Sequence, residues 1–253
     1  MRTDLNADVG ESFGAYVLGQ DPAIMPCVTS VSVACGFHAG DPGVMRQTVA
    51  LAREHGVAVG AHPGFPDLAG FGRRQMRLTP AEIEDLVVYQ IGALAAVAAA
   101  QGVRLQHVKP HGALYNMAAG EPQLADAIAR AVASVDRHLL LVGLSGSALV
   151  DAGHRAGLRT ASEVFADRGY RSNGSLVPRD AEGAVLEDPD VVSVRALEMV
   201  RRLQIASVDG GAVRVQPDTI CVHGDTPGAA NLARAIRRAL EEAGVAVKAM
   251  ASA

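Results

Sequence analysis

Short aliphatic and β-branched runs alternate with amphipathic segments along the whole chain. The runs predict seven buried strands and a short eighth one, over residues 3–8, 30–34, 57–61, 105–108, 139–143, 159–164, 219–222 and 245–248. Apolar positions at helical spacing predict helices over residues 42–55, 80–100, 122–135, 147–156, 190–205 and 228–243. Strand and helix therefore alternate, which is typical of the α/β class.

Buried-looking strands separated by helices indicate a parallel sheet covered by helices. About seven such units in 253 residues predict one domain over residues 1–253. The expected fold is a TIM-like, seven-stranded (β/α) barrel, with a doubly wound open sheet as the alternative. A small β-hairpin insertion is expected over 205–217, and long loops over 65–78 and 165–189.

Composition narrows the classes of function. The net charge is −4 and Trp is absent, so no nucleic-acid partner is expected. The N-terminal segment is polar and the longest apolar stretch, 91–100, is too short to cross a bilayer, so we expect neither secretion nor a membrane partner. Three cysteines without a CxxC pair favour a reducing compartment, and hence the cytoplasm.

Reactive side chains gather where predicted strands end. The segments ACGFHAGD (34–41), GAHPGFPD (60–67) and HVKPHGALYN (107–116) bring His38, His62 and His111 to such positions, and His223 follows the last strong strand. Ligands bind at the carboxyl ends of strands in parallel α/β folds. The repetition therefore predicts one enzyme site assembled from several loops.

Three further positions carry charge or polarity into the predicted barrel. Asn6 and Asp8 share one face of the first strand, either as a hydrogen-bond network or with Asp8 as a base at the barrel mouth. Lys109 ends a buried strand, so its ammonium must meet a carboxylate or an anionic ligand. Either a structural salt bridge with Asp8 or Glu163, or a catalytic role for the lysine, satisfies this need.

The sixth strand and the loop after it supply further candidates. Glu163 is expected to point into the barrel, and Arg168 and Arg179 could hold a carboxylate or phosphate in bidentate fashion. The GFGRR segment (70–74) offers a weaker anion site. Each arginine could equally be a solvated loop residue.

The sequence contains only weak grounds for a metal or a nucleotide site. It has no GxxxxGK[ST] loop, no Rossmann glycine fingerprint and no HExxH pair. Asp8, His38 and His62, with His223 as a further ligand, could bind a metal such as Zn²⁺. Because Lys109 nearby would repel a cation, no bound metal is firmly expected.

Six segments in order, spanning nearly the whole chain, together resemble the LamB/YcsF family: LNADVGESFG, ACGFHAGDP, GAHPGFPDLAGFGRR, HVKPHGALYN, EVFADRGY and TICVHGD. The departures from the common family pattern are Ala7 for Cys, Cys27 for Tyr, Gly169 for Ala and Ser32 for Asn. None of them removes a reactive group named above, although Ser32 leaves any role of that amide open.

The resemblance implies a seven-stranded barrel and ATP-dependent hydrolysis of the lactam of 5-oxoproline to glutamate, carried out with 5-oxoprolinase subunits B and C. ATP, as Mg-ATP, is expected mainly on those partners because this chain lacks a P-loop. The expected catalytic residues are Asp8, His62, Lys109, His111 and Glu163. The expected substrate-binding residues are Asn6, His38, Arg168, Arg179 and His223.

Within that set, Asp8 or His62 is expected to activate water, and Lys109 and His111 to stabilise charge on a phosphorylated lactam oxygen. Two alternatives stay open. One is a metal-dependent amide or sugar deacetylase, which a stoichiometric metal would favour. The other is a non-catalytic lactam-binding or transport-coupled module, which would not need several titratable groups in one pocket.

Overall fold

Seven parallel strands close into a barrel in the computed structural model, which describes residues 1–179, 181–223 and 228–250. The strands are β1 (Arg2–Val9), β2 (Ser30–Ala34), β3 (Ala58–His62), β4 (Leu105–Val108), β5 (Leu140–Leu144), β6 (Arg159–Phe165) and β9 (Thr219–His223). Each strand pairs with the next, and β9 pairs with both β6 and β1. The predicted seven-stranded, TIM-like barrel is confirmed, and the open sheet is wrong.

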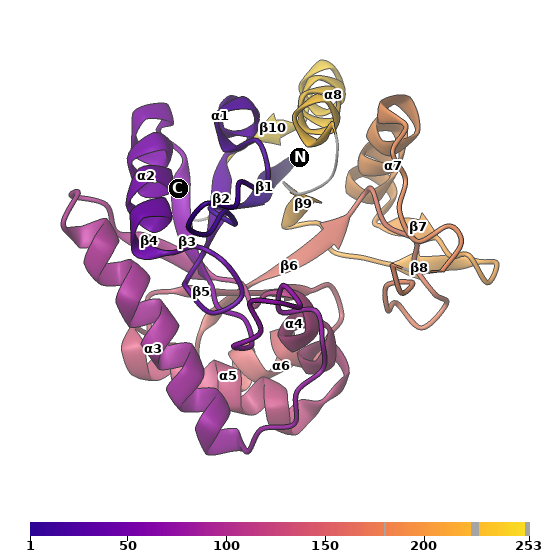
Figure 1. The fold of residues 1–253 in the computed structure, drawn as a ribbon. Coiled ribbons are helices and arrows are strands. Elements are labelled where there is room, and N and C mark those ends of the chain that lie inside the picture. The colour runs from indigo at the N-terminus through magenta and orange to yellow at the C-terminus, as the bar shows by residue number, and fades with distance from the viewer. Residues whose placement is uncertain (180, 224–227, 251–253) are drawn as a thin grey trace.

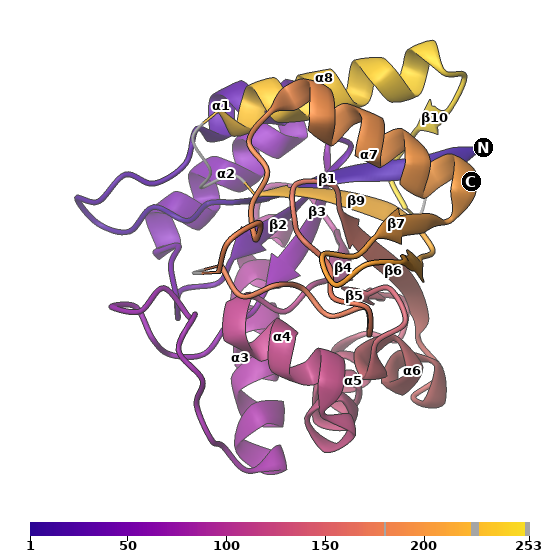
Figure 2. The same cartoon turned by 90° about the vertical axis from the view of Figure 1, so that its right-hand side faces the viewer.

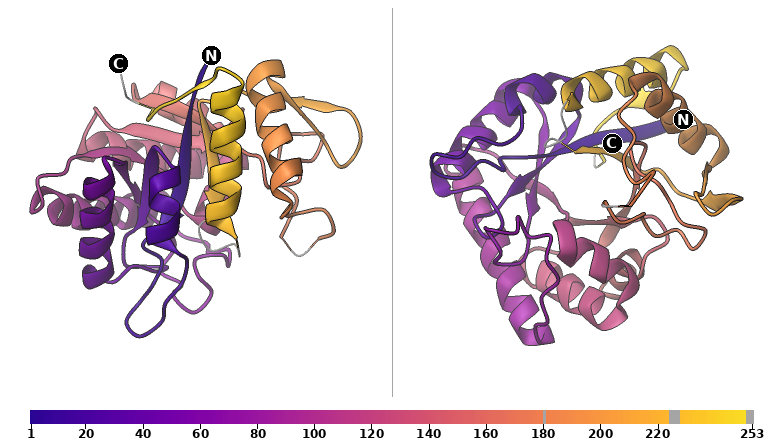
Figure 3. Two further views of the ribbon diagram at one scale, coloured as in Figure 1. Left: turned by 90° about the horizontal axis from the view of Figure 1, so that it is seen from above. Right: turned by 45° about the vertical axis from the view of Figure 1, so that its right-hand side comes forward.

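Helices surround this barrel, as Figures 1 and 3 show. The helices that the sequence predicted are α2 (Pro42–His55), α3 (Pro80–Ala99), α5 (Pro122–Val135), α6 (Ala148–Arg155), α7 (Pro189–Arg202) and α8 (Ala229–Glu242). Their starts have local causes: Thr79 and Glu82 form a capping box before α3, and Asp41 accepts two backbone N–H bonds at the start of α2.

The two faces of each barrel strand differ. On β1, Leu5, Ala7 and Val9 belong to the hydrophobic core. The residues between them, Asn6 among them, contact other strands across the barrel. Because side chains alternate along a strand, burying one face against helices leaves the other for the barrel interior, which here is polar.

Other elements were not predicted, or have other bounds. The sequence pattern did not predict three short helices: α1 (Asp21–Ile24), the 3₁₀ helix η1 (Met25–Cys27) and α4 (Gly112–Gly120). The helix expected over 190–205 ends at Arg202, because Leu203 adopts a left-handed φ of 54° and its N–H bonds back to Met199. Apolar residues continue at helical spacing beyond Leu203, so the sequence pattern predicted a helix that is longer than the observed one.

Past Leu203 the chain forms the predicted hairpin, with β7 (Gln204–Ala206) antiparallel to β8 (Ala212–Arg214). This hairpin lies outside the barrel beside α7 (Figure 2). The predicted eighth strand is β10 (Ala246–Val247), which pairs with Arg2 and Thr3 at the start of β1. In the described part of the chain, every helix is too short or too polar to traverse a bilayer.

Candidate functional site

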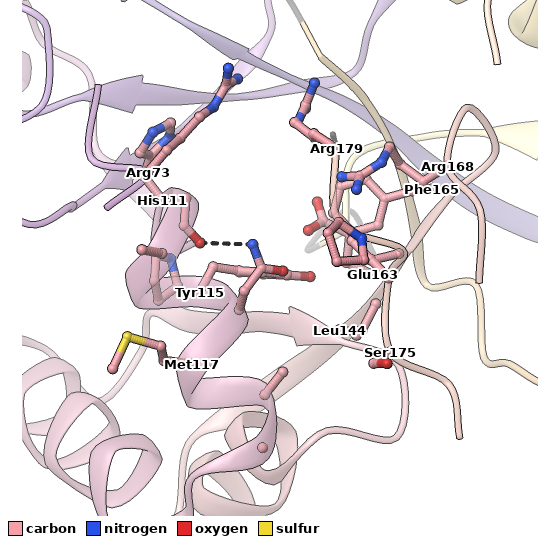
Figure 4. A pocket seen from close by; sticks show the side chains of 18 of the residues that line it. Arg73, His111, Tyr115, Met117, Leu144, Glu163, Phe165, Arg168, Ser175 and Arg179 are labelled. Atoms are coloured by element: carbon pink, nitrogen blue, oxygen red, sulfur yellow. Dashed lines mark hydrogen bonds between the residues drawn. The ribbon is translucent and has the colours of Figure 1, made fainter. Parts of the chain in front are cut away.

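A cavity of about 620 Å³ lies at the carboxyl ends of the barrel strands (Figure 4). Residues after β3, β4 and β6 form its walls, together with α4. Its polar and aromatic lining consists of Asp8, His62, Arg73, Gln75, Lys109, His111, Tyr115, Asn116, Glu121, Glu163, Phe165, Arg168, Ser175 and Arg179. Five predicted catalytic positions thus reach one cavity, although they are far apart in sequence.

Lys109 is the centre of a buried group that we call the lysine cluster, made of Asn6, Asp8, Lys109, Glu163 and Cys221. Its ammonium lies 2.7 Å from Asp8 Oδ1 and 2.9 Å from Glu163 Oε1. It also donates to Asn6 Oδ1 at 2.9 Å and to Cys221 Sγ at 3.2 Å. The salt bridge that the sequence left open is therefore present, with both carboxylates.

Electrostatics keep this lysine charged. Burial by itself would lower the pKa of Lys109, but the nearby Asp8 and Glu163 carboxylates hold it well above its ordinary value. Burial also raises the pKa of Cys221 well above normal, so that group stays a neutral thiol. Since three N–H donors already meet four acceptors, Lys109 is suited to fixing Asp8 rather than to accepting a proton.

A hydrogen-bonded network connects the lysine cluster to the deeper interior. Asn6 donates to Glu163 Oε1 at 3.0 Å and to Thr219 Oγ1 at 2.6 Å. Thr219 donates in turn to Asp4 at 2.5 Å, as does Ser30 at 2.8 Å. Burial raises the pKa of Asp4 to about 6 despite these bonds. Asn6 therefore belongs to the interior network that the sequence left as one alternative for it.

A second group, the histidine cluster, lies on the other side of Asp8 and consists of Glu11, His38, His62 and His111. All four side chains are buried. His111 Nδ1 lies 3.0 Å from His62 Nε2 and 3.5 Å from Glu11 Oε1. His38 Nε2 lies 3.6 Å from the same carboxylate oxygen, and its ring stacks on that of His111 at 3.7 Å.

Backbone carbonyls orient two of these rings. His62 Nδ1 lies 2.7 Å from the carbonyl oxygen of Lys109, and His111 Nε2 lies 2.8 Å from that of Phe71. Burial lowers the pKa of His111 to about 3 and that of His38 well below its normal value. Asp8 joins the two clusters, because its Oδ2 lies 3.4 Å from His62 Nε2.

The predicted arginines differ in what they contact. Arg168 is buried and donates to the backbone carbonyls of Ala184 and Val177 at 2.9 and 2.6 Å, so it ties together its own loop. Arg179 is half-buried on the cavity wall. On the opposite wall stands the exposed Arg73, stacked over Phe71 at 4.9 Å (Figure 4). Its neighbour Arg74 pairs with Asp67 instead.

Sequence reasoning missed several residues of the site. Glu11 lies three positions after Asp8, just beyond β1, and nothing in the local pattern marks it. Tyr115 comes from the unpredicted α4; burial and the Glu163 carboxylate raise its pKa well above its ordinary value. His223 ends β9 opposite Asp8, but its side chain lies outside the described part of the structure.

Comparison with known proteins finds matches along nearly the whole chain. The family model described as "LamB/YcsF family" matches residues 3–253. This chain belongs to the LamB/YcsF family. The resemblance carried by the six sequence segments is thereby confirmed.

Relatives of this LamB/YcsF chain match it end to end. A protein of Heliobacterium modesticaldum, named as the A subunit of 5-oxoprolinase, is 57% identical over 249 residues, which cover 98% of each chain. The protein of the same name from Bacillus subtilis is 56% identical over 247 residues, covering 98% of this chain and 96% of its own. The crystal structure of the Thermus thermophilus lactam utilization protein is 51% identical, covers 98% of this chain and 100% of its own, and superposes with a TM-score of 0.93.

Proposed function

We propose that this chain is the A subunit of an ATP-dependent 5-oxoprolinase and opens the lactam of 5-oxo-L-proline to L-glutamate together with subunits B and C. Relatives of that name match it along its full length. The structural observation that supports the proposal is the pairing of Asp8 with Lys109 on the wall of a cavity of about 620 Å³. That volume lies within the roughly 300–1,000 Å³ usual for small-molecule sites.

The chemistry needs an activated amide, because an unstrained five-membered lactam resists hydrolysis. Transfer of the γ-phosphoryl group of ATP to the lactam oxygen yields ADP and makes the ring carbon electrophilic. Water then adds to this carbon and loses a proton. The carbon–nitrogen bond breaks as the nitrogen takes up a proton, and hydrolysis of the resulting acyl phosphate releases glutamate and phosphate.

In this scheme Asp8 accepts the proton of the attacking water. Lys109 and Glu163 fix its position, since the ammonium holds Asp8 Oδ1 at 2.7 Å and leaves Oδ2 directed toward His62. We therefore reassign Lys109 from direct stabilisation of the phosphorylated oxygen to positioning of the base. Arg73 and Arg179, rather than Arg168, bind the substrate carboxylate or phosphate, because Arg168 donates to its own loop.

We expect ATP to bind mainly to the partner subunits, which deliver its phosphoryl group at the cavity mouth between Arg73 and Arg179. The cytoplasmic location stays a prediction from composition. Cys27, Cys35 and Cys221 are buried free thiols, which suits a reducing compartment.

The experiment measures 5-oxoproline-dependent ADP release by this chain alone and then with subunits B and C added. We expect turnover only in the complete complex. Asp8→Asn should lower it about 100-fold or more, because the base is lost. Asp85→Asn, an exposed change on α3, serves as the matched control, and co-purification shows that each variant still assembles.

Absence of lactam-dependent ADP release from the complete complex would reject the proposed function. Near-normal turnover of an assembled Asp8→Asn complex would reject only the role of Asp8.

The histidine cluster favours a second candidate function, that of a metal-dependent amide or sugar deacetylase. Acetate release from N-acetylated sugars by the isolated chain, without ATP, would support this function over the first. Full-length relatives named as the A subunit of 5-oxoprolinase favour lactam hydrolysis.

A further inference from the structure

Four ligand-type side chains from four separate segments converge in the histidine cluster. Glu11 follows β1, His38 follows β2, His62 ends β3 and His111 follows β4. One ligand atom from each side chain lies within 4.8 Å of the other three. Buried polar groups normally have hydrogen-bond partners, so each ring nitrogen in this cluster is expected to have one.

The bonds to carbonyl oxygens determine the tautomers of two rings. A carbonyl oxygen only accepts, so His62 carries its proton on Nδ1, next to Lys109 O, and His111 carries its proton on Nε2, next to Phe71 O. In neutral imidazoles the opposite nitrogens are then both lone-pair acceptors. These two acceptors, His62 Nε2 and His111 Nδ1, face each other at 3.0 Å. Two lone pairs at that distance repel unless a positive charge lies between or beside them.

His38 adds an independent observation. Its side chain is 0% exposed, and neither of its ring nitrogens has a hydrogen-bond partner among the described residues. Its Nε2 is directed at Glu11 Oε1, 3.6 Å away, which is too long for a hydrogen bond. Leaving a buried imidazole in this state is unfavourable, and coordination to a cation would remove that cost.

Two glycines make room for these rings. A Cβ at Gly64 would lie 2.6 Å from His38 Nδ1, and one at Gly72 would lie 2.8 Å from His38 Cβ and 2.9 Å from His111 Cδ2. Gly72 also has a φ of +63°, which disfavours other residues there. The backbone of two loops is therefore shaped closely around the histidine pair.

We propose that Glu11, His38, His62 and His111 form a binding site for one transition-metal dication, with Zn²⁺ as the best fit. A tetrahedral site with metal–ligand bonds of about 2.1 Å has ligand atoms about 3.4 Å apart. Three of the six distances between the ligand atoms, 3.0, 3.5 and 3.6 Å, are close to that spacing, and all six are within 4.8 Å. Three imidazoles and one carboxylate suit zinc or a similar metal, whereas Mg²⁺ and Ca²⁺ prefer oxygen ligands.

The surroundings support the site. The carbonyl oxygens of Lys109 and Phe71 hold the two rings by their other nitrogens, as outer partners do in metal sites. The ammonium of Lys109 counted against a metal when only the sequence was considered. It is paired with Asp8 and Glu163 and so exerts little net repulsion on a cation. The proposed metal site follows from the positions of Glu11, His38, His62 and His111 and does not depend on which substrate the protein binds.

The test measures metal directly. The chain is purified without chelator and its metal content is determined by mass spectrometry; the chelator-treated protein is then titrated with Zn²⁺ by calorimetry. We expect one equivalent of metal per chain and a higher melting temperature on rebinding. His38→Gln and Glu11→Gln should each weaken Zn²⁺ binding about 100-fold or more. His55→Gln, an exposed change at the end of α2, should leave binding unchanged.

Two results would overturn the site: a wild-type chain that binds no Zn²⁺, Co²⁺ or Mn²⁺ at one equivalent, or equal affinity in the wild type and both ligand variants. If His38→Gln does not fold, Glu11→Gln decides. Absorption of bound Co²⁺ adds a readout of coordination that a purely structural role of these residues would not change. A chain that binds no metal in a complex that still releases ADP would overturn this inference and leave the proposed function standing.

Discussion

The two clusters that meet at Asp8 are built on opposite electrostatic principles. In the lysine cluster an ammonium lies within 2.9 Å of two carboxylates and an amide oxygen, and Thr219 and Asp4 continue the hydrogen bonds inward. In the histidine cluster lone pairs face one another, and the nitrogens of His38 have no hydrogen-bond partner among the described residues. Both clusters are almost completely buried.

This difference shows what each cluster requires. Buried charges are tolerated when paired, so the lysine cluster is satisfied by the protein alone and can hold Asp8 in one orientation. The histidine cluster would be satisfied by the metal cation proposed above. One side of the site is thus complete after folding, whereas the other would be completed by the proposed metal ion.

The largest effect is expected from Lys109→Met. This change leaves Asp8 and Glu163 buried without their cation, so the free energy of unfolding should fall by about 3–5 kcal/mol. Turnover should fall about 100-fold or more. Urea unfolding measures the first effect, and ADP release by the assembled complex measures the second.

The double variant Lys109→Met/Glu163→Gln should recover part of that stability, because it removes one of the stranded carboxylates. In the metal-free chain, His38→Gln should cost only about 1 kcal/mol or less, since no hydrogen bond is lost. Equal losses in the two clusters would contradict the contrast drawn between them.

A smaller effect is expected at the rim, where each side of the cavity supplies one arginine. Arg73→Ala and Arg179→Ala should each raise the KM for 5-oxoproline or ATP about 10-fold, because a charge-assisted contact to an anion is lost. Steady-state kinetics of the complete complex check this result. Arg77→Ala, on the same loop as Arg73 and also exposed, is the control. An unchanged KM in both rim variants would move the anion site elsewhere.

The last effect depends on pH and concerns Asp4, at the inner end of the lysine cluster's hydrogen-bonded network, whose pKa is raised by burial from 3.8 to about 6. The folded state therefore holds its proton more tightly than the unfolded chain does. This contribution to stability, on the order of 3 kcal/mol, is complete below about pH 4 and is lost as the pH rises through 6. Asp4→Asn, which is neutral throughout, should lack this part of the pH dependence.

Urea unfolding of both proteins between pH 4 and 8 measures the difference directly. If the two stability curves run parallel over that range, the carboxyl group of Asp4 does not titrate as its burial requires.

Much of this protein could be predicted from the chain alone. Periodicity and capping residues determined nearly all the barrel strands and surrounding helices, because both depend on contacts within a few residues. Since the carboxyl ends of parallel strands share one rim, the gathering of Asp8, His62, Lys109 and His111 at one cavity also followed from the pattern.

Which of these groups satisfy one another depends on how the chain folds in three dimensions. Strand register and barrel closure place Lys109 between Asp8 and Glu163, tie Arg168 to its own loop, and bring Glu11 to His38 and His111. These contacts join residues from distant parts of the chain, and a shift of one residue in register would turn a side chain to the other face of its strand. A local sequence pattern does not determine the distances between side chains that are far apart in the chain. The sequence therefore predicted where the site lies but not which groups its side chains contact.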